Sequence, residues 1–288
     1  MKKLISVIIP CYNENHILNE TIKRAVNQKY ENKEIIIVAD NPTKDVEKII
    51  KKWYKKVKII KNSHNNWGLT GSLNNGIKES KGEIIVTLLA DCLPKNDKWL
   101  ISLVKNFKDH NVVAVASKVK NDDKTFDKFD PLVKDIMHDR QKVYSPGLDE
   151  KGCAYRKNTL EEVGLFDSKH FKTAGEDFDM YYKMTKEGKV ISGNEPYVIH
   201  VHPLDLQKIY NRSASYSRGS GVLFRIYGYK FFTFKSILKN LFPLWGIAKG
   251  IKTPANYSNQ KLKLILIYIK LNWIYIINFT KSFILKKQ

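Results

Sequence analysis

The chain has 288 residues, enough for one large α/β domain with an appendage or for two small domains. Its hydrophobic content of 43% and aromatic content of 11% allow a sizeable core, which argues against intrinsic disorder. The formal net charge of +21 is unevenly spread, because no Asp or Glu follows Asp205 whereas 15 Lys and Arg do. Such a basic block predicts contact with phosphates of nucleic acid, lipid head groups or substrates, or else a solvated basic face.

The cysteines and the N-terminus exclude several classes of protein. There is no Cys-x-x-Cys pair, so a zinc ribbon or a disulfide framework is not expected, and a reducing compartment fits the three cysteines Cys11, Cys92 and Cys153. The apolar N-terminal run stops at Pro10 without a small-residue cleavage site, so it predicts a buried first strand rather than a secretory signal.

Strand and helix patterns alternate through the first two thirds of the chain. Strands are expected at residues 4–10, 34–38, 57–61, 83–89 and 112–117, and helices at 15–28, 46–54, 69–80 and 99–107. Strands that are separated by helices are joined by right-handed crossovers, so the pattern predicts an α/β fold with a mostly parallel sheet.

The regular pattern fails between residues 121 and 152. This stretch is charged and contains Pro131 and Pro146, so it predicts a long loop or a short-helix insertion over a site. Regular signals resume at Cys153 and continue to about His202. From residue 206 the chain becomes basic, aromatic and helical, so we place a domain boundary near 205, with domains at 1–205 and 206–288.

Acidic segments follow several of the expected strands. They are residues 10–14 (PCYNE), 39–42 (ADNP), 90–94 (ADCLP) and, later, 175–179 (GEDFD). Ligands of open parallel sheets bind at the carboxyl ends of the strands, so these four segments are expected to converge on one edge.

These segments resemble the family 2 glycosyltransferases over roughly residues 4–202. The resemblance is carried, in order, by residues 6–14 (SVIIPCYNE), 68–76 (GLTGSLNNG), 81–85 (KGEII), 163–167 (VGLFD) and 175–177 (GED). It implies the GT-A fold, a Rossmann-like, mostly parallel sheet flanked by helices. It also implies an inverting transfer of a sugar from a UDP- or GDP-linked donor.

The resemblance also implies a set of nucleotide-sugar contacts. They are Pro10, Tyr12, Glu14, Asp40, Gly68, Gly71, Asn74, Ala90 and Asp91. Tyr12 and Glu14 would hold the base and the ribose, and Asp40 would accept a hydrogen bond from the base. The alternatives are a helix cap or turn for Asp40, and tight turns with helix packing for the glycines. A P-loop is excluded, since no Gly-Lys-Ser/Thr follows.

Asp91 matches the second acid of the Asp-x-Asp motif of this family, which holds Mg²⁺ or Mn²⁺ through carboxylate oxygen. Leu89 stands in place of the first acid, which leaves the ribose contact of that acid open. His200 and His202 lie on one side of an extended segment, and either, with His200 preferred, could reach the metal or the diphosphate. The alternatives are a strand-end turn for Asp91 and hydrogen-bonded structural histidines.

The acid pair Glu176-Asp177 is the second candidate centre. The resemblance implies that Asp177 is the general base that takes the proton of the acceptor hydroxyl, and that Glu176 orients the acceptor. Alternatively, both are acids favoured at a helix N-terminus. Arg212 and Arg218 are further candidates, as cover for the diphosphate.

The basic tail predicts a membrane surface rather than nucleic acid, because no nucleic-acid-binding motif accompanies it. Lys263, Lys270 and Lys281 fall on one helical face within an apolar segment, as in an interfacial amphipathic helix. The alternatives are a tail that packs on the catalytic domain and a spanning helix, which Lys270 would interrupt.

Together these features predict a peripheral or monotopic enzyme at the cytoplasmic face of the membrane. It would act on a lipid-linked or cell-envelope glycan and bind no nucleic acid. Because Ala39 and Leu89 occupy acid positions of the family, the alternative is a non-catalytic protein that binds a nucleotide-sugar or a lipid glycan.

Overall fold

The computed structural model describes residues 3–14, 16–62, 66–145, 147–172 and 174–284. Contacts divide the chain into two compact units. The first consists of Met1–Asp122, Lys142–Lys172 and Glu176–His202; the second consists of Asp123–Gln141, Thr173–Gly175 and Pro203–Gln288. The basic C-terminal residues therefore share a unit with part of the stretch in which the sequence predicts a loop or short helices.

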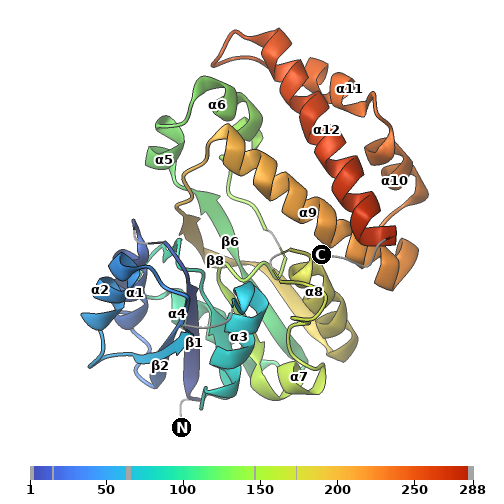
Figure 1. Ribbon diagram of the computed structural model, residues 1–288. Helices are drawn as coiled ribbons and strands as arrows, with labels where there is room; N and C mark the ends of the chain where they lie inside the picture. Colours follow the sequence, from blue (N-terminus) through green and yellow to red (C-terminus); the bar gives the residue numbers. More distant parts are fainter. Residues whose placement is uncertain (1–2, 15, 63–65, 146, 173, 285–288) are drawn as a thin grey trace. The chain divides into compact units, whose positions relative to one another are not determined.

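Within the described residues, the first unit is built on an eight-stranded sheet with the order β3-β2-β1-β4-β7-β6-β8-β5 (Figure 1). Its strands are β1 (Ile5–Cys11), β2 (Lys33–Asp40), β3 (Lys58–Asn62), β4 (Ile84–Thr87), β5 (Cys92–Pro94), β6 (Val112–Asn121), β7 (Cys153–Arg156) and β8 (Lys189–His200). β1 pairs in parallel with β2 and β4, β2 with β3, and β6 with β8. β7 is antiparallel to β4 and β6, and β5 is antiparallel to β8. The predicted α/β class is confirmed, with an antiparallel insertion that the sequence pattern does not reveal.

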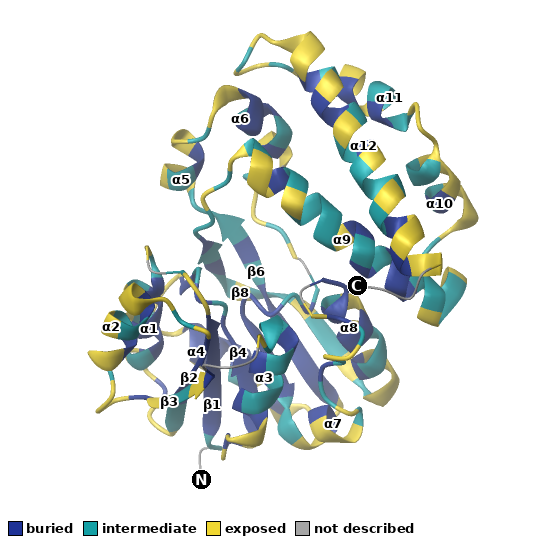
Figure 2. Ribbon diagram, viewed as in Figure 1, coloured by how far each residue is buried: buried dark blue, intermediate teal, exposed yellow. Residues whose placement is uncertain are grey.

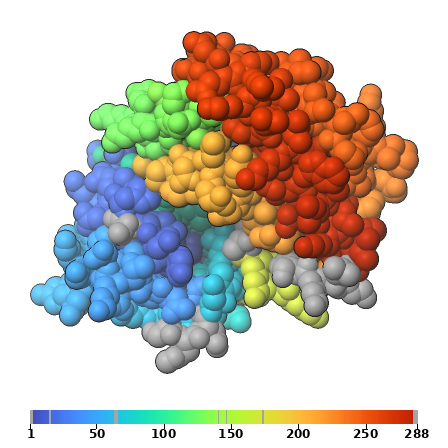
Figure 3. All heavy atoms as spheres, turned by 45° about the horizontal axis from the view of Figure 1, so that its top comes forward, coloured from blue at the N-terminus to red at the C-terminus, as the bar shows by residue number. Residues whose placement is uncertain are grey.

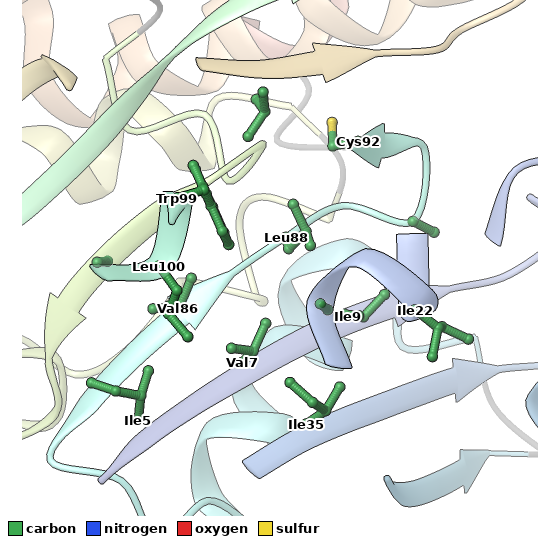
Figure 4. Packing of buried hydrophobic residues seen from close by; sticks show 14 of the residues in the cluster. Ile5, Val7, Ile9, Ile22, Ile35, Val86, Leu88, Cys92, Trp99 and Leu100 are labelled. Atoms are coloured by element: carbon green, nitrogen blue, oxygen red, sulfur yellow. The ribbon is translucent and has the colours of Figure 1, made fainter. Parts of the chain in front are cut away.

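Helices cover both faces of this sheet. They are α1 (Leu18–Val26), α2 (Lys44–Lys51), α3 (Gly68–Lys78), α4 (Trp99–Val104), which continues into η1 (Lys105–Lys108), α7 (Lys157–Glu162) and α8 (Glu176–Glu187). One buried cluster joins Ile5, Val7 and Ile9 of β1 to α1, α2 and α4 (Figure 4). The other joins Ile8 of the same strand to α3, α7 and α8. The strand alternation explains this division, because successive side chains of β1 point to opposite faces.

The described part of the second unit is helical. Its elements are α5 (Asp123–Asp127), α6 (Pro131–Met137), η2 (His138–Arg140), α9 (Leu206–Tyr227), η3 (Gly228–Lys230), α10 (Phe234–Leu241), α11 (Trp245–Lys252) and α12 (Lys261–Ile284). Glycines permit the close packing on α12. A Cβ on Gly221 of α9 would lie 2.5 Å from the carbonyl oxygen of Phe279, and one on Gly246 of α11 would lie 2.5 Å from that of Tyr268.

The outward face of α12 carries an apolar stripe. Leu264, Ile267 and Tyr268 are buried in the unit, whereas large apolar side chains at Leu262, Leu266, Trp273, Ile277 and Ile284 are exposed (Figure 2). In the space-filling view, side chains of α12 (red) reach the surface (Figure 3). Among the described helices, α12 is long and apolar enough to cross a membrane, and 28% of its most apolar window is buried.

Candidate active site

Asp91 and two histidines form one cluster in the first unit. Asp91 lies in the turn before β5, and Oδ2 of its carboxylate is 3.1 Å from Nε2 of His200 and 3.1 Å from Nδ1 of His202. The antiparallel pairing of β5 with β8 places Cys92 opposite His200 and so brings the end of β8 to Asp91. The two imidazole rings stack at 5.3 Å between centroids. The structure thus brings together Asp91, His200 and His202, the three residues that the sequence predicts as metal ligands.

The protonation states of this cluster suit a cation. Burial by itself would raise the pKa of Asp91, but His200 and His202 outweigh it and hold that pKa well below its usual range. Burial lowers the pKa of His200, although Asp91 opposes this shift. At neutral pH the carboxylate is therefore ionised and the His200 imidazole is neutral, so both have lone pairs to offer a divalent ion.

Cys92 lies in the same cluster, since the ligand atoms of Asp91, Cys92 and His200 are within 4.8 Å of one another. Burial, followed by the charge of Asp91, raises the pKa of the Cys92 thiol well above its usual value. The thiol therefore keeps its proton, with Sγ 3.6 Å from Oδ1 of Asp91. Because hard cations prefer oxygen, the set that fits Mg²⁺ or Mn²⁺ is Asp91 with the imidazoles, without Cys92.

Glu176 and Asp177 lie in the first turn of α8. Glu176 is only 7% exposed, and burial together with the neighbouring Asp177 raises its pKa to about 8. Oε2 of this carboxyl group has no hydrogen-bond partner among the described residues. Asp177 is half-buried; burial raises its pKa, although the Phe178 N–H, which donates to Oδ1 at 2.9 Å, lowers it. The pair therefore combines a largely protonated acid with a carboxylate of increased basicity.

The segment Asp149-Glu150-Lys151 belongs to the same charged environment. Asp149 and Lys151 form an ion pair in which both side chains are 11% exposed. Glu150 is fully buried, and its Oε1 accepts a hydrogen bond of 2.8 Å from the Tyr155 hydroxyl. Burial, followed by the charges of Glu176 and Asp177, raises the pKa of Glu150 well above its usual range.

Lys151 remains a cation despite its burial. Burial lowers the pKa of Lys151, but Asp149 outweighs it, so the pKa is raised. The Lys151 charge acts on Glu176 and Asp177 as well as on Cys92 and His200. This segment was not predicted from the sequence, although a charged run just before a buried strand is a signal for it.

Asp40 joins the end of β2 to the start of α3. Its carboxylate is buried and accepts one hydrogen bond on each oxygen, from Nδ2 of Asn62 at 2.7 Å and from the Gly68 N–H at 2.9 Å. Gly68 has φ +66°, and a Cβ there would lie 3.1 Å from the carbonyl oxygen of Lys172. β1, β2 and β4 run in parallel, so Pro10, Asp40 and Asp91 lie at the same edge of the sheet, where the carboxyl ends of these strands meet.

The first loop is ordered by Glu14, whose Oε2 accepts hydrogen bonds from the N–H groups of Tyr12 at 2.7 Å and Asn13 at 3.0 Å. The Tyr12 side chain is 49% exposed. The loop thus presents an aromatic ring to solvent, while one oxygen of Glu14 stabilises its backbone.

Three other predicted contact residues make packing interactions. The side-chain amide of Asn74 donates to the Phe166 carbonyl at 2.7 Å and accepts from its N–H at 3.0 Å. A Cβ on Gly71 would lie 2.9 Å from Cβ of Trp67. Ala90 is buried, and its carbonyl oxygen accepts a 2.7 Å hydrogen bond from the Thr21 hydroxyl.

Ala39 and Leu89, which stand where the family has acids, both lie in apolar surroundings. Ala39 is buried, and Leu89 packs against the core cluster of the first unit. Asp91 is therefore the acid of this turn that faces the imidazoles.

The family model described as "Glycosyl transferase family 2" matches residues 6–164, which is more than half of the chain. The chain belongs to glycosyltransferase family 2. It is 27% identical over 226 residues to an uncharacterized glycosyltransferase of Haemophilus influenzae, covering 72% of this chain and 68% of that protein. It spans 62% and 16% of the length of two other curated relatives that it matches.

Two solved structures share the fold of this glycosyltransferase. One is a mannosyltransferase from Pyrobaculum calidifontis in complex with GDP-Man and Mn²⁺, with a TM-score of 0.67, 16% identity, and coverage of 100% of this chain and 89% of that one. The other is TarS of S. aureus in complex with UDP-GlcNAc, with a TM-score of 0.56, 17% identity, and coverage of 97% and 91%. The predicted GT-A fold and enzyme class are therefore confirmed.

Arg212 and Arg218 of this glycosyltransferase lie on α9, in the second unit. Arg212 donates from Nε to the Tyr216 hydroxyl at 2.8 Å, and Arg218 donates from Nη1 to Asn278 at 3.1 Å. Their expected contact with the diphosphate stays a prediction.

Proposed function

We propose that this enzyme is an inverting, metal-dependent glycosyltransferase that acts at the cytoplasmic face of a membrane. Its donor is a UDP- or GDP-linked sugar, and its acceptor is a lipid-linked or cell-envelope glycan. The proposal rests chiefly on the cluster of Asp91, His200 and His202, which lies in the same unit as the acid pair Glu176-Asp177. The donors bound to the mannosyltransferase and to TarS support the choice of nucleotide-sugar.

In this proposal, Asp91 and the two imidazoles hold the cation. A bound Mg²⁺ or Mn²⁺ would offset the negative charge of the departing nucleoside diphosphate. Asp91 supplies an ionised carboxylate, and His200 supplies a neutral ring, so neither must lose a proton before binding.

Asp177 acts as the general base. It takes the proton of the acceptor hydroxyl while that oxygen attacks the anomeric carbon on the face opposite the diphosphate, and this single displacement inverts the carbon. The raised pKa of Asp177 makes its carboxylate a stronger proton acceptor near neutral pH. Glu176, largely protonated, donates a hydrogen bond that orients the acceptor.

The first loop and the strand ends hold the nucleotide. Tyr12 stacks on the base and Glu14 contacts the ribose, while Asp40 uses its remaining lone pairs for the base. Gly68 and Gly71 allow the nucleotide to approach the backbone closely, and Pro10 and Ala90 contact it through backbone atoms. Asn74 positions the start of α3 through its hydrogen bonds with Phe166.

In this proposal residues 1–205 form the catalytic domain and 206–288 the membrane-associating region, with Asp123–Gln141 of the former packed in the compact unit of the latter. Helical residues advance about 100° each, so the exposed apolar side chains of α12 form one stripe opposite its buried face. Lys263, Lys270 and Lys281 border this stripe and are exposed. An apolar stripe with flanking lysines suits a helix that lies in the interface of an anionic bilayer.

A spanning orientation of α12 is less favourable. Lys270 would sit near the middle of the helix, at a cost of about 3 kcal/mol. The buried residues of α12 pack against other helices of its unit instead.

Nucleotide-sugar hydrolysis tests the catalytic part of this proposal. Wild-type enzyme is expected to hydrolyse one of several UDP- and GDP-sugars with Mn²⁺ and to lose this activity with EDTA. Asp91→Ala should weaken donor binding and abolish the effect of Mn²⁺. The matched control is Asp97→Ala, at a partly exposed acid that pairs with Lys29. Donor binding that responds neither to chelator nor to Asp91→Ala would overturn the metal site.

A further inference from the structure

The second unit contains a cavity of about 270 Å³ that the proposed reaction does not use. Its walls come from α6, α9, α10, α11 and α12. All of its described lining residues belong to the second unit. The cavity is therefore defined within one compact body.

The charge of the lining is one-sided. Arg212 and Lys249 line the cavity, and none of the described residues that line it is acidic. Arg212 is prepositioned, because its Nε donates to the Tyr216 hydroxyl and its guanidinium lies 5.1 Å from the centroid of that ring. This leaves the terminal nitrogens of the Arg212 guanidinium for an anion, and a guanidinium can bind phosphate through two hydrogen bonds.

The rest of the lining suits a polyhydroxylated group. Trp245, Tyr268 and Tyr275 supply aromatic surface, with Lys239 over the Trp245 ring and Phe279 stacked on Tyr275, and Ser213 and Asn240 supply polar atoms. Rings pack on the apolar faces of sugars and polyols, while hydroxyl and amide groups bond to their hydroxyls.

Lys249 also borders a second cavity, of about 200 Å³, that contains Asp135 and Asp139. The Asp135 carboxylate accepts hydrogen bonds from the N–H groups of Tyr257 and Ser258 and from the Ser258 hydroxyl. The Lys249 ammonium lies 5.2 Å from the ring centroid of Tyr268, which lines both cavities.

We propose that the 270 Å³ cavity binds a phosphorylated polyol, with the phosphate on Arg212 and Lys249 and the hydroxylated part among the tyrosines and Trp245. This chemistry is shared by a soluble sugar phosphate and by the phosphorylated head group of a lipid. The described residues that line this cavity belong to the second unit, whereas the acids and histidines proposed to act on the donor belong to the first. The proposal does not depend on the proposed function, and in it Arg212 binds this phosphate instead of the diphosphate of the donor.

Lys249→Gln and Lys252→Gln form a charge-matched pair on α11, because both remove one positive charge and Lys252 does not line the cavity. The probe is glucose 1-phosphate, and its binding to the full chain is measured by titration calorimetry. Glucose and inorganic phosphate, the two halves of the probe, are titrated separately. Lys249→Gln is expected to weaken the probe about tenfold or more, since a hydrogen bond to a charged group is lost. Lys252→Gln should change the affinity less than about twofold, because exposed charges contribute little.

Two further variants separate this site from the donor site and from misfolding. Asp91→Ala should leave probe binding intact. Lys249→Arg keeps the positive charge and should regain the binding that Lys249→Gln loses. Loss of the probe in Asp91→Ala would place it at the donor site and overturn the proposal.

Flotation with phosphatidylglycerol and phosphatidylcholine vesicles identifies the source of the phosphate. A larger loss of binding to phosphatidylglycerol in Lys249→Gln than in Lys252→Gln assigns the cavity to a lipid head group. Equal flotation with a selective loss of glucose 1-phosphate assigns it to a soluble ester. If neither probe separates the two variants, the cavity is not a phosphate site.

Discussion

The two units of this glycosyltransferase distribute polar and apolar side chains in opposite ways. The first buries ionisable groups, including Glu150 and Glu176, beneath a conventional α/β core. The second places large apolar side chains at its surface, such as Leu262, which is 71% exposed. Each arrangement costs stability in water, since charges are normally exposed and large apolar groups normally buried. The contrast fits the proposed function, in which the first unit carries the chemistry and the second meets a membrane surface.

The largest expected effect tests the chemical half of this contrast. Asp177→Asn keeps the size of the side chain but cannot accept a proton, so kcat should fall about 10²–10⁴-fold with donor affinity nearly unchanged. Steady-state kinetics with donor and acceptor measure both quantities. Glu187→Gln, at an exposed acid of the same helix, serves as the control. Retention of more than about a tenth of wild-type turnover would move the base to another residue.

The pH dependence of stability tests whether the buried acids act as proposed. The pKa of Glu176 is about 8 in the folded protein and near 4.5 when unfolded, so the folded state holds more protons between these values. Stability should therefore fall as the pH rises through this window, by up to about 1.4 kcal/mol per unit from this group.

Urea denaturation at pH 5.5 and 8 follows this loss, which should be smaller in Glu176→Gln and unchanged in Glu187→Gln. If the free energy of unfolding changed equally with pH in all three proteins, Glu176 would be ionised in the folded state. The first unit would then not bury this group as a neutral acid.

The apolar half of the contrast is tested on α12. Replacing Trp273 and Ile277 with serine removes the middle of the exposed stripe without touching its buried face. Full burial of such side chains is worth about 1.5–3 kcal/mol each, so binding to phosphatidylglycerol vesicles should weaken at least about tenfold. Thr280→Ala, at an exposed polar position, is the control. Unchanged flotation would show that the stripe serves another partner.

The smallest effect concerns the packing that holds this stripe outward. Gly246→Ala places a methyl group against the backbone of α12, where 2.5 Å separates it from the Tyr268 carbonyl oxygen. Overpacking of this kind should destabilise the protein by about 1–3 kcal/mol in urea denaturation. Lys252→Ala on the same helix should leave stability nearly unchanged. A neutral Gly246→Ala would mean that α11 moves freely on α12.

The sequence predicted most elements of the first unit because long buried strands and amphipathic helices carry clear periodicity. β5 and β7 were missed because strands of three and four residues are too short to show any period. Only the end of β8 was predicted, since Gly193, Asn194 and Pro196 interrupt its alternation. In the stretch 121–152, short helices formed at Asp123–Asp127 and Pro131–Met137.

The site was predictable where residue types alone restrict the chemistry. Asp91, His200 and His202 could be grouped because a strand end and a two-residue alternation place them, and the structure brings them together. Asp149 and Lys151 were missed, because a charged run before a strand does not by itself show that the charges are buried beside acids that are distant in sequence.

The position of β5 has a consequence for how the site is assembled. This strand is the last in the sheet order, and among the described strands it pairs with β8 alone. Edge segments open locally at a lower free energy than the whole fold, and opening here would part Asp91 from His200. Whatever binds between them therefore selects the closed form and slows amide exchange at Lys95 and Val201, whose N–H groups donate to the carbonyls of Tyr197 and Asp91 between the two segments. Ligand binding at the site and pairing of β5 with β8 are therefore coupled, and hydrogen exchange at these two amides reports both.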